Sequence, residues 1–170
     1  MNLVLDKRQL GPEVFQLEVQ APRIQKRWKA GQFIILRPLT TSERIPLTLV
    51  DSDAERQSVT LVIQAIGNTT KEAVALEPGE FVADVVGPLG EPASMSEGKR
   101  VVCMAGGVGV AEVLPVARAF KDHGNHVTAL WGALGRTADS RRGAEGGSGP
   151  AGVGHRRRDL RIPRQRAAIA

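Results

Sequence analysis

The sequence is poor in cysteine and in aromatic residues, and it has no long apolar run. Cys103 is the single cysteine among 170 residues, which excludes an internal disulfide and a metal site built from several thiolates. No stretch reaches the roughly 20 apolar residues of a transmembrane helix, and the first residues lack the apolar core of a secretory signal. These absences predict a cytoplasmic protein that does not bind a membrane.

Positive charge is concentrated at one end of the chain. The net charge is +5, but residues 134–170 alone hold nine arginines and three acids, which gives +6. The first 133 residues hold the remaining 14 basic and 15 acidic residues, which gives −1. No aromatic residue follows Trp131, so the basic segment has no side chain that stacks on a base. The composition therefore argues against a nucleic-acid partner.

The first 97 residues have the pattern of short strands separated by polar turns. Alternating apolar and β-branched residues predict six strands, at residues 3–5, 14–19, 33–37, 47–50, 58–66 and 81–86. One helix interrupts them, with Thr69 as its first cap, Glu72 completing a capping box, and Pro78 ending it. The pattern predicts a small antiparallel β-barrel over residues 1–97.

From residue 98 the periodicity changes to that of a parallel α/β unit. Residues 100–105 form a near-continuous apolar run, which predicts a strand buried on both faces. A glycine-rich loop follows, then a helix over residues 110–123 and a second strand over residues 126–131. Such a β-α-β unit places a ligand at the carboxyl ends of its strands. Residues 98–133 are thus the start of an incomplete nucleotide-binding domain.

The segment Arg44-Ile45-Pro46-Leu47-Thr48 is the first candidate binding site. It lies between two predicted strands, which places an arginine, a proline and a hydroxyl at fixed spacing on a sheet edge. The guanidinium of Arg44 suits a diphosphate, and the Thr48 hydroxyl is a short, directional hydrogen-bonding group. A dinucleotide flavin needs both. Alone, the segment is a weak indication, because a charged turn residue before a proline usually belongs to an ordinary loop.

Three glycine-containing segments are the other candidates. Gly67-Asn68-Thr69-Thr70 gathers backbone N–H groups where a helix begins, which attracts anions but also describes an ordinary capped turn. Gly106-Gly107-Val108-Gly109 allows close approach to a phosphate, or serves only a tight strand-to-helix turn. Gly87-Pro88-Leu89-Gly90 alone predicts a turn. No set of side chains suited to acid–base or nucleophilic catalysis, or to metal binding, can be assembled.

Taken in order, these four motifs resemble those of the ferredoxin–NADP reductase superfamily. The resemblance is strongest to the electron-transfer subunits of dihydroorotate dehydrogenase and to the small subunits of sulfide dehydrogenase, or NADH-dependent ferredoxin:NADP oxidoreductase. It covers residues 2–132 and implies a barrel that binds FAD, followed by a domain that binds NAD(P)H. It further implies a larger oxidoreductase or dehydrogenase subunit as partner.

The resemblance also implies residue roles. Arg44 would hold the FAD diphosphate, while Pro46, Leu47 and Thr48 would line the isoalloxazine ring. The remaining cofactor-binding residues are Gly67, Thr69 and Thr70 at the FAD phosphates or ribose, Gly87 and Gly90 in the flavin site, and Gly106, Gly107 and Gly109 at the nicotinamide nucleotide. The flavin performs the redox chemistry, so no catalytic side chain is required. The iron–sulfur cluster expected in the family has no cysteines here, because none follows Cys103.

Residues 134–170 do not continue the family pattern. They are rich in Arg, Gly and Ala and have no apolar period, which predicts disorder and is typical of a GC-rich gene translated out of frame. Read one base later, the codons for residues 154–161 permit Ala-Thr-Asp-Asp-Gly-Thr-Tyr-Gly, which is similar to a segment of the family. We therefore expect a truncated or frameshifted nucleotide domain after about residue 133, a hypothesis that the nucleotide sequence of the gene tests.

Three hypotheses of function follow from the sequence. The first is a flavoprotein electron-transfer subunit that works between NAD(P)H, FAD and an iron–sulfur or dehydrogenase partner. The second is a truncated flavin-binding remnant that does not turn over. The third is a barrel-type interaction domain without a cofactor. The sequence does not distinguish NADH from NADPH or identify the physiological acceptor.

Overall fold

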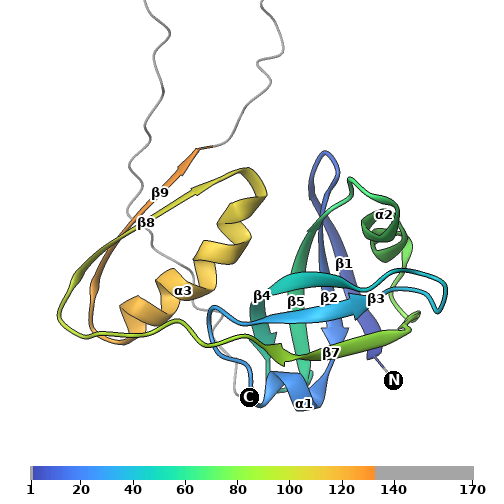
Figure 1. Ribbon diagram of the computed structural model, residues 1–170, viewed down its shortest axis with the longest axis horizontal. Coiled ribbons are helices and arrows are strands. Elements are labelled where there is room, and N and C mark those ends of the chain that lie inside the picture. Colours follow the sequence, from blue (N-terminus) through green and yellow to red (C-terminus); the bar gives the residue numbers. More distant parts are fainter. Residues whose placement is uncertain (1, 133–170) are drawn as a thin grey trace, which may run out of the picture.

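Seven strands form one antiparallel sheet that curls into a nearly closed barrel, as Figure 1 shows for the computed structural model. The structure describes residues 2–132, so the predicted tail and the proposed frameshift lie outside the described residues. The strands follow each other across the sheet in the order β6-β1-β2-β5-β4-β3-β7. Their bounds are β1 Asn2–Gly11, β2 Val14–Gln20, β3 Phe33–Arg37, β4 Ile45–Asp53, β5 Ser58–Gln64, β6 Phe81–Val82 and β7 Asp84–Leu89. The predicted antiparallel barrel is confirmed.

The barrel core is built from the alternating apolar residues of the central strands. Leu61 of β5 lies opposite Leu17 of β2 on one side and Leu49 of β4 on the other, and all three are at most 1% exposed. Ile34 and Leu36 of β3 complete this layer and are equally buried. Burial of each such side chain contributes about 2 kcal/mol to folding. The inner face is therefore fully packed, which leaves the outer side of the strands for ligands.

The second part of the chain is a parallel β-α-β unit. Strand β8 (Arg100–Gly106) pairs in parallel with β9 (His126–Gly132), and α3 (Val110–Asp122) connects them after the 3-10 turn η1 (Gly107–Gly109). The predicted fold of this part is confirmed. The predicted burial of β8 on both faces is wrong, because Val102 is 59% and Met104 71% exposed. In the described part of the chain, α3 packs against the other face of this sheet.

Contacts with the barrel hold the β-α-β unit in place. Helix α3 packs against β4, and η1 contacts β5. An ion pair joins the two parts, with Arg118 Nη1 of α3 2.8 Å from Asp51 Oδ2 of β4. The glycine-rich turn therefore lies on the same side of the molecule as the barrel strands β4 and β5.

Helix α1 (Pro22–Gln25) follows β2, and its Ile24 is buried against the barrel. One local prediction is wrong for a reason that only the tertiary structure shows. The single strand predicted at 81–86 is two strands. Its β6 part pairs with β1 and its β7 part with β3, and the chain crosses between them at Ala83, whose N–H donates to the Pro38 carbonyl oxygen.

The helix start was also misplaced. Helix α2 (Asn68–Ala75) is capped at Gly67, not at Thr69. The Gly67 N–H donates to the Thr70 hydroxyl oxygen at 2.9 Å. Thr70, at the third helical position, therefore has the capping role that the sequence predicted for Glu72. The Glu72 carboxylate instead accepts a hydrogen bond of 2.6 Å from the Ser42 hydroxyl. This bond ties α2 to the loop that leads into Arg44.

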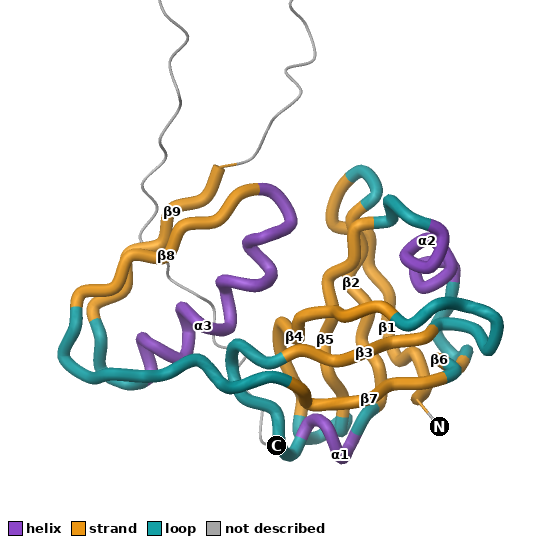
Figure 2. Tube along the Cα trace, in the orientation of Figure 1, coloured by secondary structure: helices purple, strands orange, loops and turns teal. Residues whose placement is uncertain are grey.

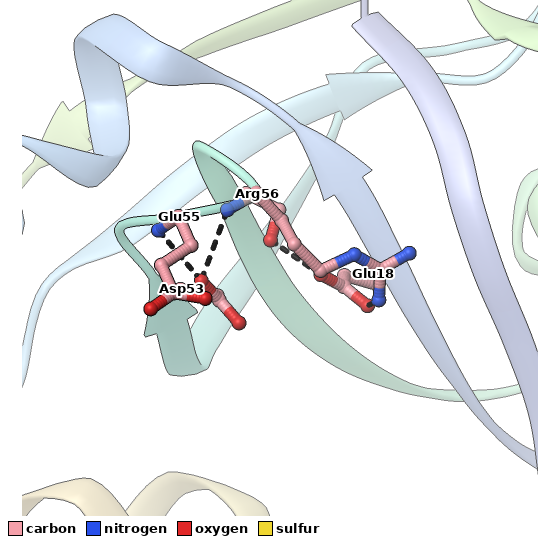
Figure 3. A network of polar contacts seen from close by, with 5 residues as sticks. Glu18, Asp53, Glu55 and Arg56 are labelled. Atoms are coloured by element: carbon pink, nitrogen blue, oxygen red, sulfur yellow. Dashed lines mark hydrogen bonds and ion pairs between the residues drawn. The ribbon is translucent and has the colours of Figure 1, made fainter. Parts of the chain in front are cut away.

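The turn between β4 and β5 is stabilised by a polar network at the end of β4 remote from Arg44 (Figure 3). Asp53 Oδ1 accepts from the N–H groups of Glu55 and Arg56, at 2.8 and 3.0 Å. The Arg56 guanidinium pairs with Glu18 of β2. Arg44 precedes β4 and Arg56 lies in the turn that follows it, so the length of the strand separates them. Arg56 is therefore a suitable control for substitutions of Arg44.

Asn125 fixes the base of the β-α-β unit, and its loss should destabilise this unit. Its buried side chain accepts from Lys99 N–H at 2.8 Å and donates to the carbonyl oxygens of Ser96 and Phe120, at 2.6 and 2.9 Å. We expect Asn125→Ala to lower the free energy of unfolding by about 2 kcal/mol, because buried backbone groups lose their partners. Urea denaturation followed by circular dichroism measures this, with exposed Asp122→Asn as the control. Equal stability of the two variants would contradict this role.

Candidate functional site

The outer side of strands β4, β3 and β7 carries most of the predicted flavin-binding residues. These strands lie side by side at one end of the sheet order (Figure 2). Along β3, Ile34 and Leu36 are buried while the alternate residues are partly exposed, and residues opposite each other in antiparallel strands share a face. We call the resulting surface the outer face. It consists of Arg44, Pro46, Thr48, Phe33, Ile35, Arg37, Asp84, Val86 and Leu89.

The outer face has apolar rows next to a charged row. Ile35 lies between Pro46 and Val86, and Val86 is 45% exposed. In the next row, Phe33 lies between Thr48 and Leu89. Successive rows are about 7 Å apart along the strands. These two rows are apolar apart from the hydroxyl of Thr48.

The charged row contains two arginines and one aspartate. Asp84 lies opposite Arg37 across β7 and β3, and the Arg44 Nη2 atom lies 2.9 Å from Asp84 Oδ2. The Arg37 Nη2 atom lies 4.0 Å from the same oxygen. The Arg44 side chain is 54% exposed, so its remaining donors face solvent. The row therefore combines an excess of positive charge with accessible donors, beside an apolar surface.

Strand β4 is an interior strand, so the prediction of a sheet edge is wrong for the strand as a whole. Its first half nevertheless has one neighbour, because residues 45–48 pair with β3 and the register with β5 begins at Leu49. The Leu49 N–H donates to the Gln32 carbonyl oxygen and so points toward β3. Successive N–H groups along a strand point to opposite sides, so the N–H of the preceding residue, Thr48, points away from β3. The missing N–H of Pro46 is thus tolerated, and the Thr48 N–H faces the side that lacks a ladder partner among the described residues.

Leu47 differs from its neighbours in the predicted site. Its side chain packs against the barrel core, so only its backbone is available at the outer face. Pro46 is exposed, and the Thr48 side chain is half-buried. Alternation along the strand therefore gives the outer face Arg44, Pro46 and Thr48.

Gly87 and Gly90 shape the margin of the outer face. Gly87 is part of β7 and not of a turn, and a Cβ there would lie 2.6 Å from Cγ2 of Ile34. Gly90 has φ +78°, and a Cβ there would lie 2.9 Å from the Phe33 ring. Gln32 holds this segment, because its Nε2 donates to the Gly90 carbonyl oxygen at 2.9 Å. Both glycines thus allow β7 to approach β3 closely.

The residues predicted at the start of α2 lie at some distance along the chain from the outer face. Gly67 precedes the helix, Thr69 is buried, and the Thr70 hydroxyl is used in the cap. Glu72, further along the helix, accepts a hydrogen bond from Ser42 in the loop before Arg44. The two threonine side chains are used in structural contacts, so the role predicted for this helix start in binding FAD rests on its backbone N–H groups.

The glycine-rich turn Gly106-Gly107-Val108-Gly109 follows β8 at the carboxyl end of the parallel strands. Gly107 has φ +56°, which explains a glycine there by backbone conformation. Gly109 has φ −60°, and a Cβ there would meet no atom within 4 Å. Neither packing nor conformation requires a glycine at 109, which leaves open space for a ligand close to the backbone.

Other chemistry is sparse in the described part of the chain. The thiol of Cys103 lies within β8, and its burial raises its pKa. Residues 2–132 contain no group of three or more His, Cys, Asp or Glu side chains that is arranged to hold a metal ion. None of the helices in these residues is long and apolar enough to span a membrane. Sequence reasoning missed Arg37, Asp84 and Gln32, although the alternation of β3 would have placed Arg37 beside Ile35.

Comparisons with known proteins agree with the fold and with the motif order. No family model matches the chain. The electron-transfer subunit homologue of dihydroorotate dehydrogenase B from Thermotoga maritima is 36% identical over 139 residues, which are 82% of this chain and 49% of that protein. The corresponding subunit from Shouchella clausii is 27% identical over 135 residues, 76% of this chain and 52% of its own length. The chain spans about half the length of the curated relatives it matches.

Solved structures show the same relationship. The NADH-dependent reduced ferredoxin–NADP oxidoreductase, studied for flavin-based electron bifurcation, is 35% identical with a TM-score of 0.76, over 79% of this chain and 49% of that one. Phthalate dioxygenase reductase shares the fold at 15% identity and a TM-score of 0.64, over 78% of this chain and 43% of its own. The chain is therefore a homologue, over about half their length, of the dihydroorotate dehydrogenase electron-transfer subunits, and it has the fold of ferredoxin–NADP reductase-type proteins.

Proposed function

We propose that this chain binds FAD on the outer face of β4, β3 and β7 and belongs to an electron-transfer subunit. The observation that carries the proposal is one surface with two arginines at one end, apolar rows beside them, and the Thr48 N–H on the half of β4 that has no register with β5 among the described residues. A dinucleotide flavin needs cations for its diphosphate, an apolar surface for its ring system and a hydrogen bond to the ring. The motif order and the named relatives support the same assignment.

The roles of the residues follow from their positions. Arg44 binds the diphosphate, while Pro46, the Leu47 backbone and Thr48 contact the isoalloxazine, with the Thr48 N–H or hydroxyl near its N5. When bound, FAD supplies the redox chemistry, so the chain has only to bind the ring, orient it and keep water from one of its faces. Gly87 and Gly90 let β7 lie close enough to complete the apolar rows.

The two helix starts complete the proposed nucleotide sites. Backbone N–H groups at Gly67, Thr69 and Thr70 favour an anion such as the phosphates of FAD. The open space at Gly109, together with Gly106 and Gly107, suits the approach of NAD(P)H to the turn after β8. The division into a barrel of residues 1–97 and a nucleotide unit of residues 98–133 is part of this proposal.

The proposed electron path runs between NAD(P)H, FAD and a partner protein. The lone Cys103 does not suffice for an iron–sulfur cluster, which needs several thiolate ligands, so any cluster on this path lies outside these 170 residues. The single cysteine agrees with a reducing cytoplasm as the location.

A second candidate is a flavin-binding chain that does not turn over. It is favoured by the exposed apolar residues Val102 and Met104, which lie on a parallel sheet of two strands in the described part of the chain. The two candidates share FAD binding and differ in NAD(P)H oxidation.

Flavin loading followed by anaerobic reduction tests both candidates. We expect the purified chain to retain one FAD per chain after desalting, because the outer face offers contacts to both ends of the cofactor. Addition of NADH or NADPH to this complex then separates the candidates: bleaching of the flavin absorbance supports electron transfer, and an unchanged spectrum supports the non-catalytic form. A colourless protein that does not take up FAD would contradict the proposal.

A further inference from the structure

Arg37 is a cation of the outer face that no sequence motif contains. It is the last residue of β3 and lies between Arg44 on one side and Asp84 on the other, since β3 is flanked by β4 and β7. Both guanidiniums approach the same carboxylate oxygen, Arg44 at 2.9 Å and Arg37 at 4.0 Å. Asp84 thus forms a hydrogen bond with Arg44 and only a long ion pair with Arg37.

The donors of Arg37 are incompletely used. Its Nε atom is buried and has no hydrogen-bond partner among the described residues. A buried donor without a partner is unfavourable, and a guanidinium carries five donors in a rigid fork. The side chain is 27% exposed, so part of it remains accessible from the outer face. Among the described residues its one ion pair is the long contact with Asp84, so the guanidinium keeps Nη donors for another acceptor on the outer face.

The charges of the row point to an anion with more than one charged group. Two guanidiniums and one carboxylate leave one positive charge in excess, and Asp84 neutralises only part of each cation's field. Two arginines that share one carboxylate can each present separate N–H groups on the same side. This arrangement suits two adjacent phosphate groups better than one.

We infer that Arg37 is a second diphosphate-binding residue, and that Asp84 holds Arg37 and Arg44 side by side for this purpose. The inference rests on the proposed function, because it places FAD on the outer face. It adds that the charged row selects a flavin that carries phosphate groups over riboflavin, which has the same ring system and no phosphate. If Arg37 had only a structural role, its substitution would lower the stability of the protein and would not change the preference for FAD over riboflavin.

Titration of Arg37→Gln with FAD and with riboflavin tests this inference. Flavin fluorescence measures both affinities, and thermal unfolding of the ligand-free variant measures stability. We expect Arg37→Gln to weaken FAD binding about tenfold, the worth of a single charge-assisted hydrogen bond, and to leave riboflavin binding unchanged. The wild-type affinity for FAD should fall with added salt more steeply than that of the variant, because the lost contact is ionic. Arg56→Gln, remote from the outer face, is the matched control and should behave as wild type.

The outcomes separate this inference from the proposed function. If wild type binds neither flavin, the proposed function fails. If wild type binds FAD and Arg37→Gln binds it equally well, the role of Arg37 is disproved and the proposed function stands. An equal loss for FAD and riboflavin would also overturn the inference, because Arg37 would then support the fold of the site and not contact a phosphate.

Discussion

Replacement of Arg44 by glutamine is expected to weaken FAD binding about 100-fold, the largest effect of any single change on ligand affinity. Arg44 is the most exposed member of the charged row and has the most free donors toward solvent, so it is expected to make at least two charge-assisted hydrogen bonds to the diphosphate. Glutamine keeps most of the length of the side chain but loses the charge and the fork of donors. Titration of the purified variant with FAD, followed by flavin fluorescence, measures the loss.

Arg56→Gln is the control for this substitution. Arg56 also pairs with a carboxylate and is 46% exposed, but it lies at the far end of β4. It should bind FAD as wild type does, since an exposed ion pair contributes little to stability. If Arg44→Gln bound FAD within twofold of wild type, the charged row would not be the diphosphate site.

Replacement of Gly87 by alanine should destabilise the barrel by about 3 kcal/mol. The added Cβ would lie 2.6 Å from Cγ2 of Ile34, which is fully buried in the barrel core. Either β7 moves away from β3 or Ile34 leaves its packed position, and both changes disturb the outer face. Urea denaturation followed by circular dichroism measures the loss of stability, and FAD titration should show weaker binding as a consequence.

Two further variants test the cause of this effect. Gly11→Ala places a Cβ where no atom lies within 4 Å, so its stability should stay within about 0.5 kcal/mol of wild type. In an Ile34→Ala background, where Cγ2 is absent, Gly87→Ala should cost much less than it does alone. Additive losses in the double variant would show that contact with Ile34 is not the reason for a glycine at 87.

The sequence predicted those helices and strands whose pattern of apolar residues is contained in a short segment of the chain. Residues 33–37 are an apolar run that Pro38 closes, and the strand bounds are the same in the structure; the helix at 110–122 was predicted to within one residue. The antiparallel barrel and the parallel unit followed from the change of period near residue 98. These features depend on side chains that are near each other in the chain.

The features that the sequence did not predict depend on distant segments. The crossing at Ala83 is set by Pro38, about 45 residues earlier in the chain, and nothing in residues 81–86 indicates two strands. The half-open edge of β4 arises because its register with β5 begins at Leu49. Arg37 and Asp84 become neighbours through the β3–β7 register, so a search for motifs along the chain would not pair them.

The predicted site residues fall into two groups for the same reason. Arg44, Pro46 and Thr48 lie on one strand, so their spacing in the sequence is also their spacing on the outer face. Thr69 and Thr70 lie on a helix whose first residue was misplaced, and their side chains are used in structural contacts. The position of a binding residue is thus easier to predict from the sequence in an extended strand than at the start of a helix. At a helix start, an error of two residues changes which backbone N–H groups and side chains are available to a ligand.

A crystal structure of the chain grown with FAD tests the central claim most directly. The account predicts the diphosphate within hydrogen-bonding distance of Arg44 and Arg37, and the isoalloxazine ring over Pro46 and Ile35 with its N5 near Thr48. FAD bound elsewhere on the chain, or crystals without FAD at saturating concentration, would contradict the assignment of the outer face as the flavin site.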